Sequence, residues 1–244
     1  MAVIIEMKSV SFSVRENRIV QDFSCQFEEG KTTAIIGPSG SGKSTVLKLS
    51  AGILVPTSGE VFFRDLEIFG MNRPQNLAFR RESSMVFQDS ALWANQDIFQ
   101  ILELPLMTHF PDMPLKERKD RINEVLKEVG YKRDLHIRPD QLSRGEQKLV
   151  GFARAMICHP ALLFLDEWTE SLDDSASKRI LQIVRNHQSK NYTVIFVSHD
   201  LRIIKSLADY VVMINDGQLS IKLSREQIEA NENLAEFLER GITS

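Results

Sequence analysis

The segment with the clearest chemical meaning is rich in glycine and ends in a lysine followed by two hydroxyl residues. The apolar run Thr33–Ile36 leads into it, and a helical pattern of apolar residues follows it. The segment reads Gly37, Pro38, Ser39, Gly40, Ser41, Gly42, Lys43, Ser44 and Thr45. Glycines at this spacing let backbone N–H groups close around phosphate oxygens at the positive end of a helix. The sequence therefore predicts a nucleotide phosphate site, with Lys43 at the β- and γ-phosphates and the Ser44 hydroxyl at Mg²⁺.

Two adjacent carboxylates supply the expected second half of such a site. The apolar run Ala161–Leu165 carries Asp166 and Glu167 at its carboxyl end. We expect Asp166 to hold Mg²⁺ through water, and Glu167 to polarise a water in line with the γ-phosphate. An acidic residue after a strand can also simply cap the next helix. Its combination with the glycine-rich segment favours nucleotide chemistry.

Three further motifs complete the set. Gln88 follows the apolar Met85–Phe87, and His199 follows the apolar run Thr193–Ser198. The segment Leu142–Gln147 ends 19 residues before Asp166. Within it, a serine and a glutamate three residues apart also have the spacing of a helix capping box.

In this order and spacing, the five motifs resemble those of the ATP-binding subunits of ABC transporters over essentially the whole chain. The resemblance implies that Gln88 touches Mg²⁺ and senses a transmembrane partner. Ser143 and Gly145 would bind the γ-phosphate of ATP held by the opposite subunit. His199 would contact the γ-phosphate in its own subunit, and Asp173 would lie in the loop that crosses the dimer seam.

The resemblance also implies the fold. It is an α/β phosphate-loop NTPase (RecA-like) fold, with a parallel sheet core, an antiparallel β subdomain and an inserted α-helical subdomain. The whole chain, 1–244, would be one nucleotide-binding domain. The core would cover 1–88 and 156–223, the helical subdomain about 89–155, and a C-terminal helix 224–241.

An assembly follows from the same resemblance. Two copies would form a head-to-tail homodimer that sandwiches two ATP molecules with Mg²⁺. The partner would be a polytopic permease, which places the ATPase peripherally on the cytoplasmic side of the inner (plasma) membrane. We expect its dock at the segment Asp89–Leu106, which is rich in apolar residues, although these could instead pack the subdomain's own core. The apolar residues in question are Ala91, Leu92, Trp93, Ile98, Phe99, Leu102 and Leu104.

The sequence departs from the family pattern in several places. Arg144 and Glu146 replace a glycine and a glutamine of the usual L-S-G-G-Q signature. After Glu167 the family usually has Pro-Thr-Ser-Ala-Leu-Asp-Pro, whereas this chain has the segment Trp168–Asp174. Val14 stands near the position of the aromatic residue that commonly stacks on adenine.

Within the family, short segments resemble the ATPases of Mla/Mce-type lipid transporters. They are Val10–Arg15, Phe87–Trp93, Ile98–Phe99, Leu104–Leu106 and Glu236–Gly241. This likeness implies lipid transport, with accessory lipid-binding Mce-type and small regulatory subunits as further partners. The alternatives are ATPases of lipoprotein-release, cell-division or small-solute systems, or a non-transport ABC protein. A stand-alone phosphate-loop kinase or GTPase would lack the signature and His199.

Composition excludes several other classes. The chain has 30 Lys and Arg against 33 Asp and Glu, a net charge of −3, and no basic run, so nucleic acid is not an expected partner. No apolar stretch approaches the roughly 18 residues that a membrane span needs. The start of the chain lacks the features of a signal peptide. Cys25 and Cys158 fit neither a disulfide framework nor a metal site, which predicts a reduced cytosolic protein.

The remaining pattern predicts how the elements alternate. Strands are expected at Val3–Val14, Ile19–Phe27, Thr33–Ile36, Glu60–Phe63, Leu162–Leu165, Thr193–Val197 and Tyr210–Ile214. Helices are expected at 43–54, 112–134, 146–158, 175–188 and 202–208, with a last one from the capping box at Ser224 to Gly241. Apolar strands that alternate with helices argue for a parallel sheet covered on both faces.

Overall fold

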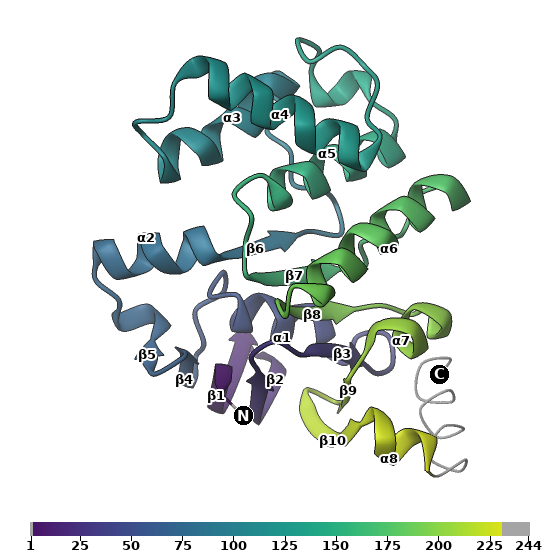
Figure 1. The fold of residues 1–244 in the computed structure, drawn as a ribbon. Helices are drawn as coiled ribbons and strands as arrows, with labels where there is room; N and C mark the ends of the chain where they lie inside the picture. Colours follow the sequence, from purple (N-terminus) through teal and green to yellow (C-terminus); the bar gives the residue numbers. More distant parts are fainter. Residues whose placement is uncertain (1, 231–244) are drawn as a thin grey trace.

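A six-stranded sheet forms the centre of the protein, in the order β10-β9-β3-β8-β7-β6. The computed structural model describes residues 2–230, and the strands from β9 to β6 run parallel, while β10 pairs antiparallel with β9. A second, antiparallel sheet has the order β2-β1-β4-β5. The phosphate-loop α/β fold with an antiparallel β-layer is therefore confirmed (Figure 1).

The strands are β1 (Val3–Val14), β2 (Asn17–Glu28), β3 (Thr32–Ile36), β4 (Ser58–Phe63), β5 (Leu66–Glu67), β6 (Ser83–Val86), β7 (Leu162–Asp166), β8 (Thr193–Val197), β9 (Tyr210–Asn215) and β10 (Gln218–Ser224). The α-helices are α1 (Lys43–Ser50), α2 (Arg73–Glu82), α3 (Ile98–His109), α4 (Leu115–Val129), α5 (Arg144–Met156), α6 (Asp174–Ser189), α7 (Leu201–Leu207) and α8 (Arg225–Glu229).

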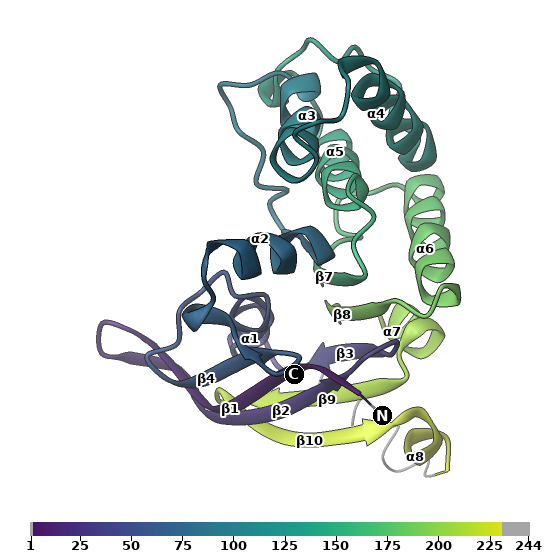
Figure 2. The ribbon, with the colours of Figure 1, turned by 60° about the vertical axis from the view of Figure 1, so that its left-hand side comes forward.

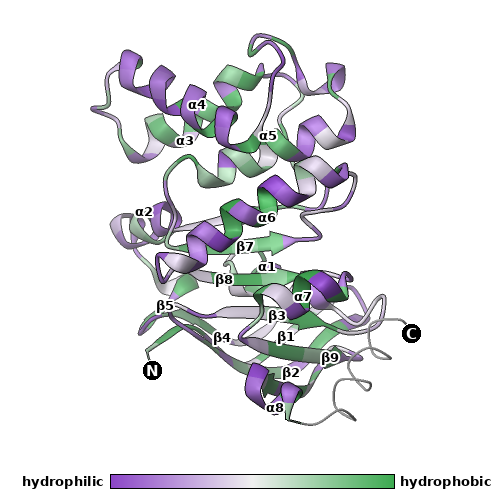
Figure 3. Ribbon diagram, turned by 45° about the vertical axis from the view of Figure 1, so that its right-hand side comes forward, coloured by the Kyte–Doolittle hydropathy of each residue, from purple (hydrophilic) through white to green (hydrophobic). Residues whose placement is uncertain are grey.

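The parallel strands are buried on both faces, as their unbroken apolar sequences predict. In β8, Ile195 packs into the core shared with α1 and the antiparallel sheet, whereas Phe196 packs into the core shared with α3–α7. The same alternation separates Ile35 from Ala34 in β3. Figure 3 shows these strands as largely hydrophobic, with the polar residues of α4 and α6 on the outside.

Helices α3, α4 and α5 lie together at the end of the molecule that is farthest from β1, β2 and β4 (Figure 2). Their apolar residues belong to the same core as one face of the central sheet: Ile101, Val125 and Val150 join Leu165 there. The helices therefore pack directly against the sheet, in addition to being joined to it by the chain.

Several predicted element bounds were wrong for local reasons. The first helix ends at Ser50 and not at 54, because Gly52 takes a left-handed conformation (φ +62°). The N–H of Ile53 then bonds back to the carbonyl of Lys48 at 2.9 Å, which is the hydrogen bond that typically closes a helix at its carboxyl end. Helix α4 is likewise shorter than 112–134, since it ends where Gly130 takes a left-handed conformation (φ +78°).

The predicted C-terminal helix begins as expected. Ser224 and Gln227 form a capping box at the start of α8, which runs over Arg225–Glu229. The rest of the helix predicted for 224–241 lies outside the described residues.

Two helices, α2 and α3, were missed, although each begins with a capping box that the sequence could have revealed. Asn72 pairs with Gln75 at α2, and Asp97 pairs with Gln100 at α3. Within residues 2–230, no helix is both long and apolar enough to span a membrane.

Candidate active site

The sheet brings four of the predicted motifs to one edge. The strands β3, β8, β7 and β6 are neighbours and run parallel, so the residues after their carboxyl ends meet. The glycine-rich segment follows β3, His199 follows β8, Asp166 ends β7, and Gln88 follows β6. Ligand sites of open parallel sheets form at this edge, and the residues for which the sequence predicts catalytic roles lie there.

The segment Gly37–Thr45 has the geometry of a phosphate cradle. Gly37 has a φ of +147°, and a Cβ there would lie 2.1 Å from the carbonyl oxygen of Ile214, so only glycine fits. Gly40 has a φ of +78° and a Cβ direction that opens onto free space. Helix α1 begins within the segment, at Lys43, and its N-cap, Gly42, makes no side-chain hydrogen bond. The first-turn N–H groups of α1 therefore remain available to an anion.

Lys43 is buried within this segment. Its ammonium group donates to the carbonyls of Gly37 and Pro38 at 2.9 and 2.7 Å. Burial lowers the pKa of Lys43, while Glu167 and Asp166 act in the opposite direction. The lysine therefore lies where the cradle and the two carboxylates meet.

The oxygens that could hold Mg²⁺ are already together. The Ser44 hydroxyl donates to Asp166 Oδ1 at 2.7 Å, and the Asp166 side chain is fully buried. The second oxygen, Asp166 Oδ2, is buried without a hydrogen-bond donor and lies 3.9 Å from the Lys48 ammonium. Burial raises the pKa of Asp166, and the Ser44 bond lowers it. An orphaned carboxylate oxygen beside a serine hydroxyl is an oxygen donor set that suits a magnesium ion.

Glu167 is held in an unfavourable backbone conformation. Its φ is +42°, which costs roughly 1–3 kcal/mol for a residue with a Cβ. Three bonds fix its main chain: its N–H donates to the Val197 carbonyl at 3.2 Å, and its own carbonyl accepts from Glu170 N and the Lys148 ammonium at 3.3 and 3.2 Å. Such strain, held by surrounding bonds, is typical of functional positions.

The Glu167 side chain has the electrostatics of a base that works near neutral pH. Burial, together with the charges of Glu170 and Asp166, raises its pKa to about 7. Its Oε1 lies 3.1 Å from His199 Nε2. Burial and Lys43 lower the pKa of His199, so the imidazole is neutral at pH 7. The pair is therefore a polar contact near neutral pH and not an ion pair, and Oε1 accepts no well-aligned hydrogen bond from the described residues.

Two residues that the sequence did not single out as site residues lie beside Gln88. The Gln88 side-chain amide donates to Glu170 Oε2 at 3.1 Å. The Lys148 ammonium, on a side chain that is almost fully buried, donates to the main-chain carbonyls of Gln88 and Phe87 at 2.5 and 3.5 Å. Glu170 stands where the family usually has a serine, and that departure was the signal for it; no comparable signal pointed to Lys148.

The signature residues lie on another element. Ser143 caps α5 in a reciprocal box with Glu146, at 2.8 and 3.2 Å, as the sequence predicted. Gly145 backs onto the loop before α6, where a Cβ would come within 2.9 Å of the Ser171 carbonyl. Asp173 caps α6 through the N–H of Ala176 at 2.7 Å. Among residues 2–230, no hydrogen bond or ion pair joins Ser143, Gly145 or Asp173 to the cradle Gly37–Thr45.

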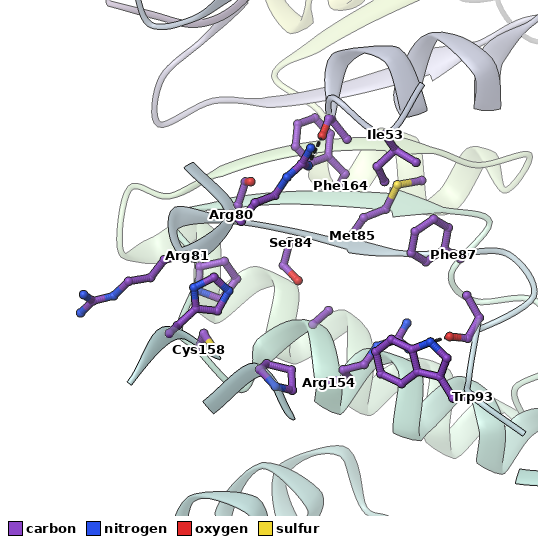
Figure 4. A pocket seen from close by; sticks show the side chains of 17 residues that line it. Ile53, Arg80, Arg81, Ser84, Met85, Phe87, Trp93, Arg154, Cys158 and Phe164 are labelled. Carbon is purple, nitrogen blue, oxygen red and sulfur yellow. Dashed lines mark hydrogen bonds between the residues drawn. The ribbon is translucent and has the colours of Figure 1, made fainter. Parts of the chain in front are cut away.

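A groove of about 470 Å³ separates the sheet from α3 and α5. Figure 4 shows Met85, Phe87 and Phe164 on one wall, facing Trp93 and Arg154 on the other. Arg154 lies under the Trp93 ring, with its guanidinium carbon 5.4 Å from the ring centroid. Trp93 is 44% exposed, whereas Ile98 and Leu102 are fully buried. The predicted docking segment is therefore mixed, because Ile98 and Leu102 on its helical part pack the interior while Leu104 is 39% exposed.

Comparisons with known proteins identify relatives of this chain. A family model described as ABC transporter matches residues 20–170. The chain is 32% identical to the L-cystine import ATP-binding protein TcyC of Bacillus subtilis over 226 residues, which cover 91% of each protein. It is 31% identical to the methionine import ATP-binding protein MetN of Corynebacterium jeikeium over 206 residues, 84% of this chain and 55% of that protein.

A solved structure is also similar to this chain. A dimeric structure of the ATP-binding cassette MJ0796, bound to ADP and Pi, aligns with a TM-score of 0.83 at 28% identity. The alignment covers 91% of this chain and 98% of that one.

The chain belongs to the ABC transporter family, and within it to the ATP-binding cassettes, which are ATPases. The descriptions of the relatives concern import of cystine and methionine, and they give no support to the predicted likeness to Mla/Mce-type lipid transporters.

Proposed function

We propose that the protein is the ATP-hydrolysing subunit of a membrane transporter, in which two copies close on two ATP molecules and drive a permease. One observation carries the proposal: the Ser44–Asp166 hydrogen bond and the Glu167–His199 contact lie together at one edge of the sheet. The cradle before α1 provides the phosphate site next to them.

The chemistry would proceed by positioning and proton acceptance. The cradle amides and Lys43 bind the β- and γ-phosphates, and Ser44, Asp166 and Gln88 would hold Mg²⁺. When bound, Mg²⁺ neutralises phosphate charge. Glu167 orients the attacking water and accepts its proton at an oxygen whose pKa of about 7 matches that task. His199 Nε2 lies 3.1 Å from the Glu167 carboxyl and would contact the γ-phosphate.

The second half of each site would come from the partner copy. Ser143 and Gly145 lie at the start of α5, where N–H groups of the helix can reach an anion. Because no described contact joins them to their own cradle, we propose that they bind the γ-phosphate held by the partner, with Asp173 in the seam between the copies. The dimer reported for MJ0796, itself an ATP-binding cassette, supports this arrangement.

We also propose that the helices between β6 and β7, residues 89–155, form one subdomain that contacts the permease and moves with it. The groove lined by Phe87, Trp93 and Arg154 would take a short amphipathic helix of that permease. Closure of the dimer on ATP would move this helix. The protein would then sit on the cytoplasmic side of the membrane as a peripheral subunit.

Two cargo classes have support. The segments Phe87–Trp93 and Leu104–Leu106 resemble lipid-transport ATPases of the Mla/Mce type, which favours lipids and accessory lipid-binding subunits. The relatives TcyC and MetN are described as importers of cystine and methionine, which favours a small solute. Lipid vesicles that stimulate ATP hydrolysis by the transporter complex would support the first class. Stimulation by a solute-binding protein and its solute, and not by lipid, would support the second.

The base is tested by Glu167→Gln. This substitution keeps size and polarity but removes the proton acceptor, so hydrolysis should fall by about 10²–10⁴-fold. ATP binding should persist, and the closed dimer should accumulate with ATP in size-exclusion chromatography. Near-normal hydrolysis would assign the base to another carboxylate, with Glu170 or Asp173 as candidates.

The dock is tested by Trp93→Ala and Leu92→Asp, which should release the permease while ATP binding persists. Leu115→Ala is a matched control, because that side chain is 49% exposed and does not line the groove. Trp93 lines the groove, and Leu92 beside it packs against the core. Retained permease binding in both variants would show that the dock lies elsewhere.

A further inference from the structure

Gln88 is fixed at two points by residues from different elements. The almost fully buried Lys148, on α5, holds the main-chain carbonyl of Gln88 at 2.5 Å. Glu170, from the loop after β7, accepts a hydrogen bond from the side-chain amide at 3.1 Å. No carboxylate lies within ion-pair distance of Lys148 among the described residues, so its ammonium group depends on main-chain carbonyls.

The Glu170 contact decides which end of the Gln88 amide is free. An ionised carboxylate only accepts hydrogen bonds, so the amide must turn its NH₂ group toward Glu170. The carbonyl oxygen Oε1 is then left for a donor or a cation. Only this oxygen can bind Mg²⁺, because the NH₂ group offers no lone pair to a hard cation.

We infer that Glu170 is a positioning residue. It orients the Gln88 side-chain amide so that the amide oxygen is available to the metal of the nucleotide site, while Lys148 holds the Gln88 main chain in place. The inference rests on the proposed role of Gln88 as a magnesium contact and adds the residue that sets its orientation. Glu170 stands in place of the serine usual in the family pattern.

The geometry explains why glutamate, which is longer than the usual serine and acidic, would serve at position 170. Gln88 and Glu170 are both exposed at a cavity of about 750 Å³ between α1, the loop after β6 and the start of α5. A free glutamine side chain there would sample many rotamers, and a fixed acceptor removes part of that entropy cost before the metal arrives. The cavity is also lined by the cationic side chains of Lys48 and Arg144 and by the carboxylate of Asp89.

The test compares Glu170→Ala with Glu170→Gln. The glutamine keeps an oxygen acceptor for the Gln88 amide, whereas the alanine removes it. The readout is the affinity for Mn²⁺, which replaces Mg²⁺, measured by electron paramagnetic resonance on the full chain with a non-hydrolysable ATP analogue. Glu170→Ala should weaken Mn²⁺ binding by about three- to tenfold, the range expected for one hydrogen bond, and Glu170→Gln by less than about twofold. Glu117→Ala, at an exposed glutamate on α4, is the control.

A double-mutant cycle separates orientation of Gln88 from a general charge effect. In a Gln88→Ala background, Glu170→Ala should cause no further loss of Mn²⁺ affinity. Equal losses in Glu170→Ala and Glu170→Gln, or an additive double variant, would overturn the inference, as would unchanged or tighter Mn²⁺ binding in Glu170→Ala. If instead Gln88→Ala alone leaves Mn²⁺ affinity unchanged, the proposed role of Gln88 as a magnesium contact fails, and that outcome is distinguishable from the result of the Glu170 variants.

Discussion

At the scale of single residues, the site places carboxyl groups where they are costly to ionise. Glu167 is buried, strained in its backbone and close to the charges of Asp166 and Glu170. A protein gains no folding stability from this arrangement, because burial of an ionised carboxylate costs free energy unless it is paired. Contacts with substrate and metal would offset this free-energy cost, so the burial of these carboxyl groups indicates a functional site.

Removal of the Glu167 charge should therefore stabilise the folded chain. The pKa is about 7 in the folded protein against about 4.5 when unfolded, so the folded state binds more protons between these values. Its stability consequently falls as pH rises from 4.5 to 7. At pH 8, Glu167→Gln should raise the free energy of unfolding by about 1–3 kcal/mol, measured by urea titration. The gain should shrink toward zero at pH 4.5; a gain that is equal at both pH values would contradict the account.

His187 should produce the opposite pH dependence away from the site. Burial and the nearby Lys190 lower its pKa from 6.5 to about 4, so the unfolded chain binds the additional proton between these values. Stability then falls as pH drops from 6.5 to 4. His187→Phe keeps a ring against Tyr192 and removes this term, which amounts to about 2 kcal/mol at pH 5. Urea titrations at pH 7 and pH 5 should show a smaller loss in the variant; equal losses would refute the assignment.

At the scale of elements, α5 links the parts that must act together. Ser143 caps its first turn, and Lys148 holds the carbonyls of Gln88 and Glu167. Further along the helix, Arg154 donates to the carbonyls of Ser90 and Ala91, at 3.0 and 2.6 Å. Both of these loop residues have positive φ, at +64° and +44°, so the helix holds the loop after β6 in a strained form. A shift of α5 would therefore move the Gln88 loop with it.

Loss of the Lys148 ammonium should uncouple these parts. Lys148→Met keeps the length of the side chain but leaves the carbonyls of Gln88 and Glu167 without their donor. We expect the turnover number to fall by about tenfold, as positioning of the water and the metal contact loosens. Binding of a fluorescent ATP analogue should change little, since the cradle is on another element. Lys116→Met, at an exposed lysine, is the control; unchanged turnover in Lys148→Met would show that the carbonyl contacts are structural only.

The sequence predicted those parts of the fold and site that local spacing encodes. The cradle, the carboxylates after β7 and the Ser143–Glu146 box depend on neighbours in the chain, and the geometry around them agrees. The end of α1 at Ser50 was missed because it depends on one glycine conformation. The Lys148 contacts reach 19 and 60 residues along the chain, a distance that no periodic pattern reveals. The burial of Ile98, the first residue of α3, was likewise not predictable from its apolar character alone, because it depends on packing against distant parts of the chain.

At the scale of the whole molecule, the two halves of the chemistry are on different parts of one chain. The cradle and the base lie at the sheet edge, and the signature residues lie at the start of α5, with no described bond between the two groups. Under the proposed function, one copy would offer half of each of two sites, and a head-to-tail pair of copies would complete them.

Mixing of two inactive variants tests this central claim most directly. Lys43→Ala removes a cradle and Ser143→Arg blocks a signature, so each variant alone should hydrolyse almost no ATP. In a mixed dimer, the intact cradle of one copy meets the intact signature of the other, and one of two sites is restored. If the sites act independently, an equal mixture should recover up to about a quarter of the unsubstituted rate, since half of the dimers are mixed. An ATPase rate in the mixture that does not exceed the sum of the two variants measured alone would contradict the account.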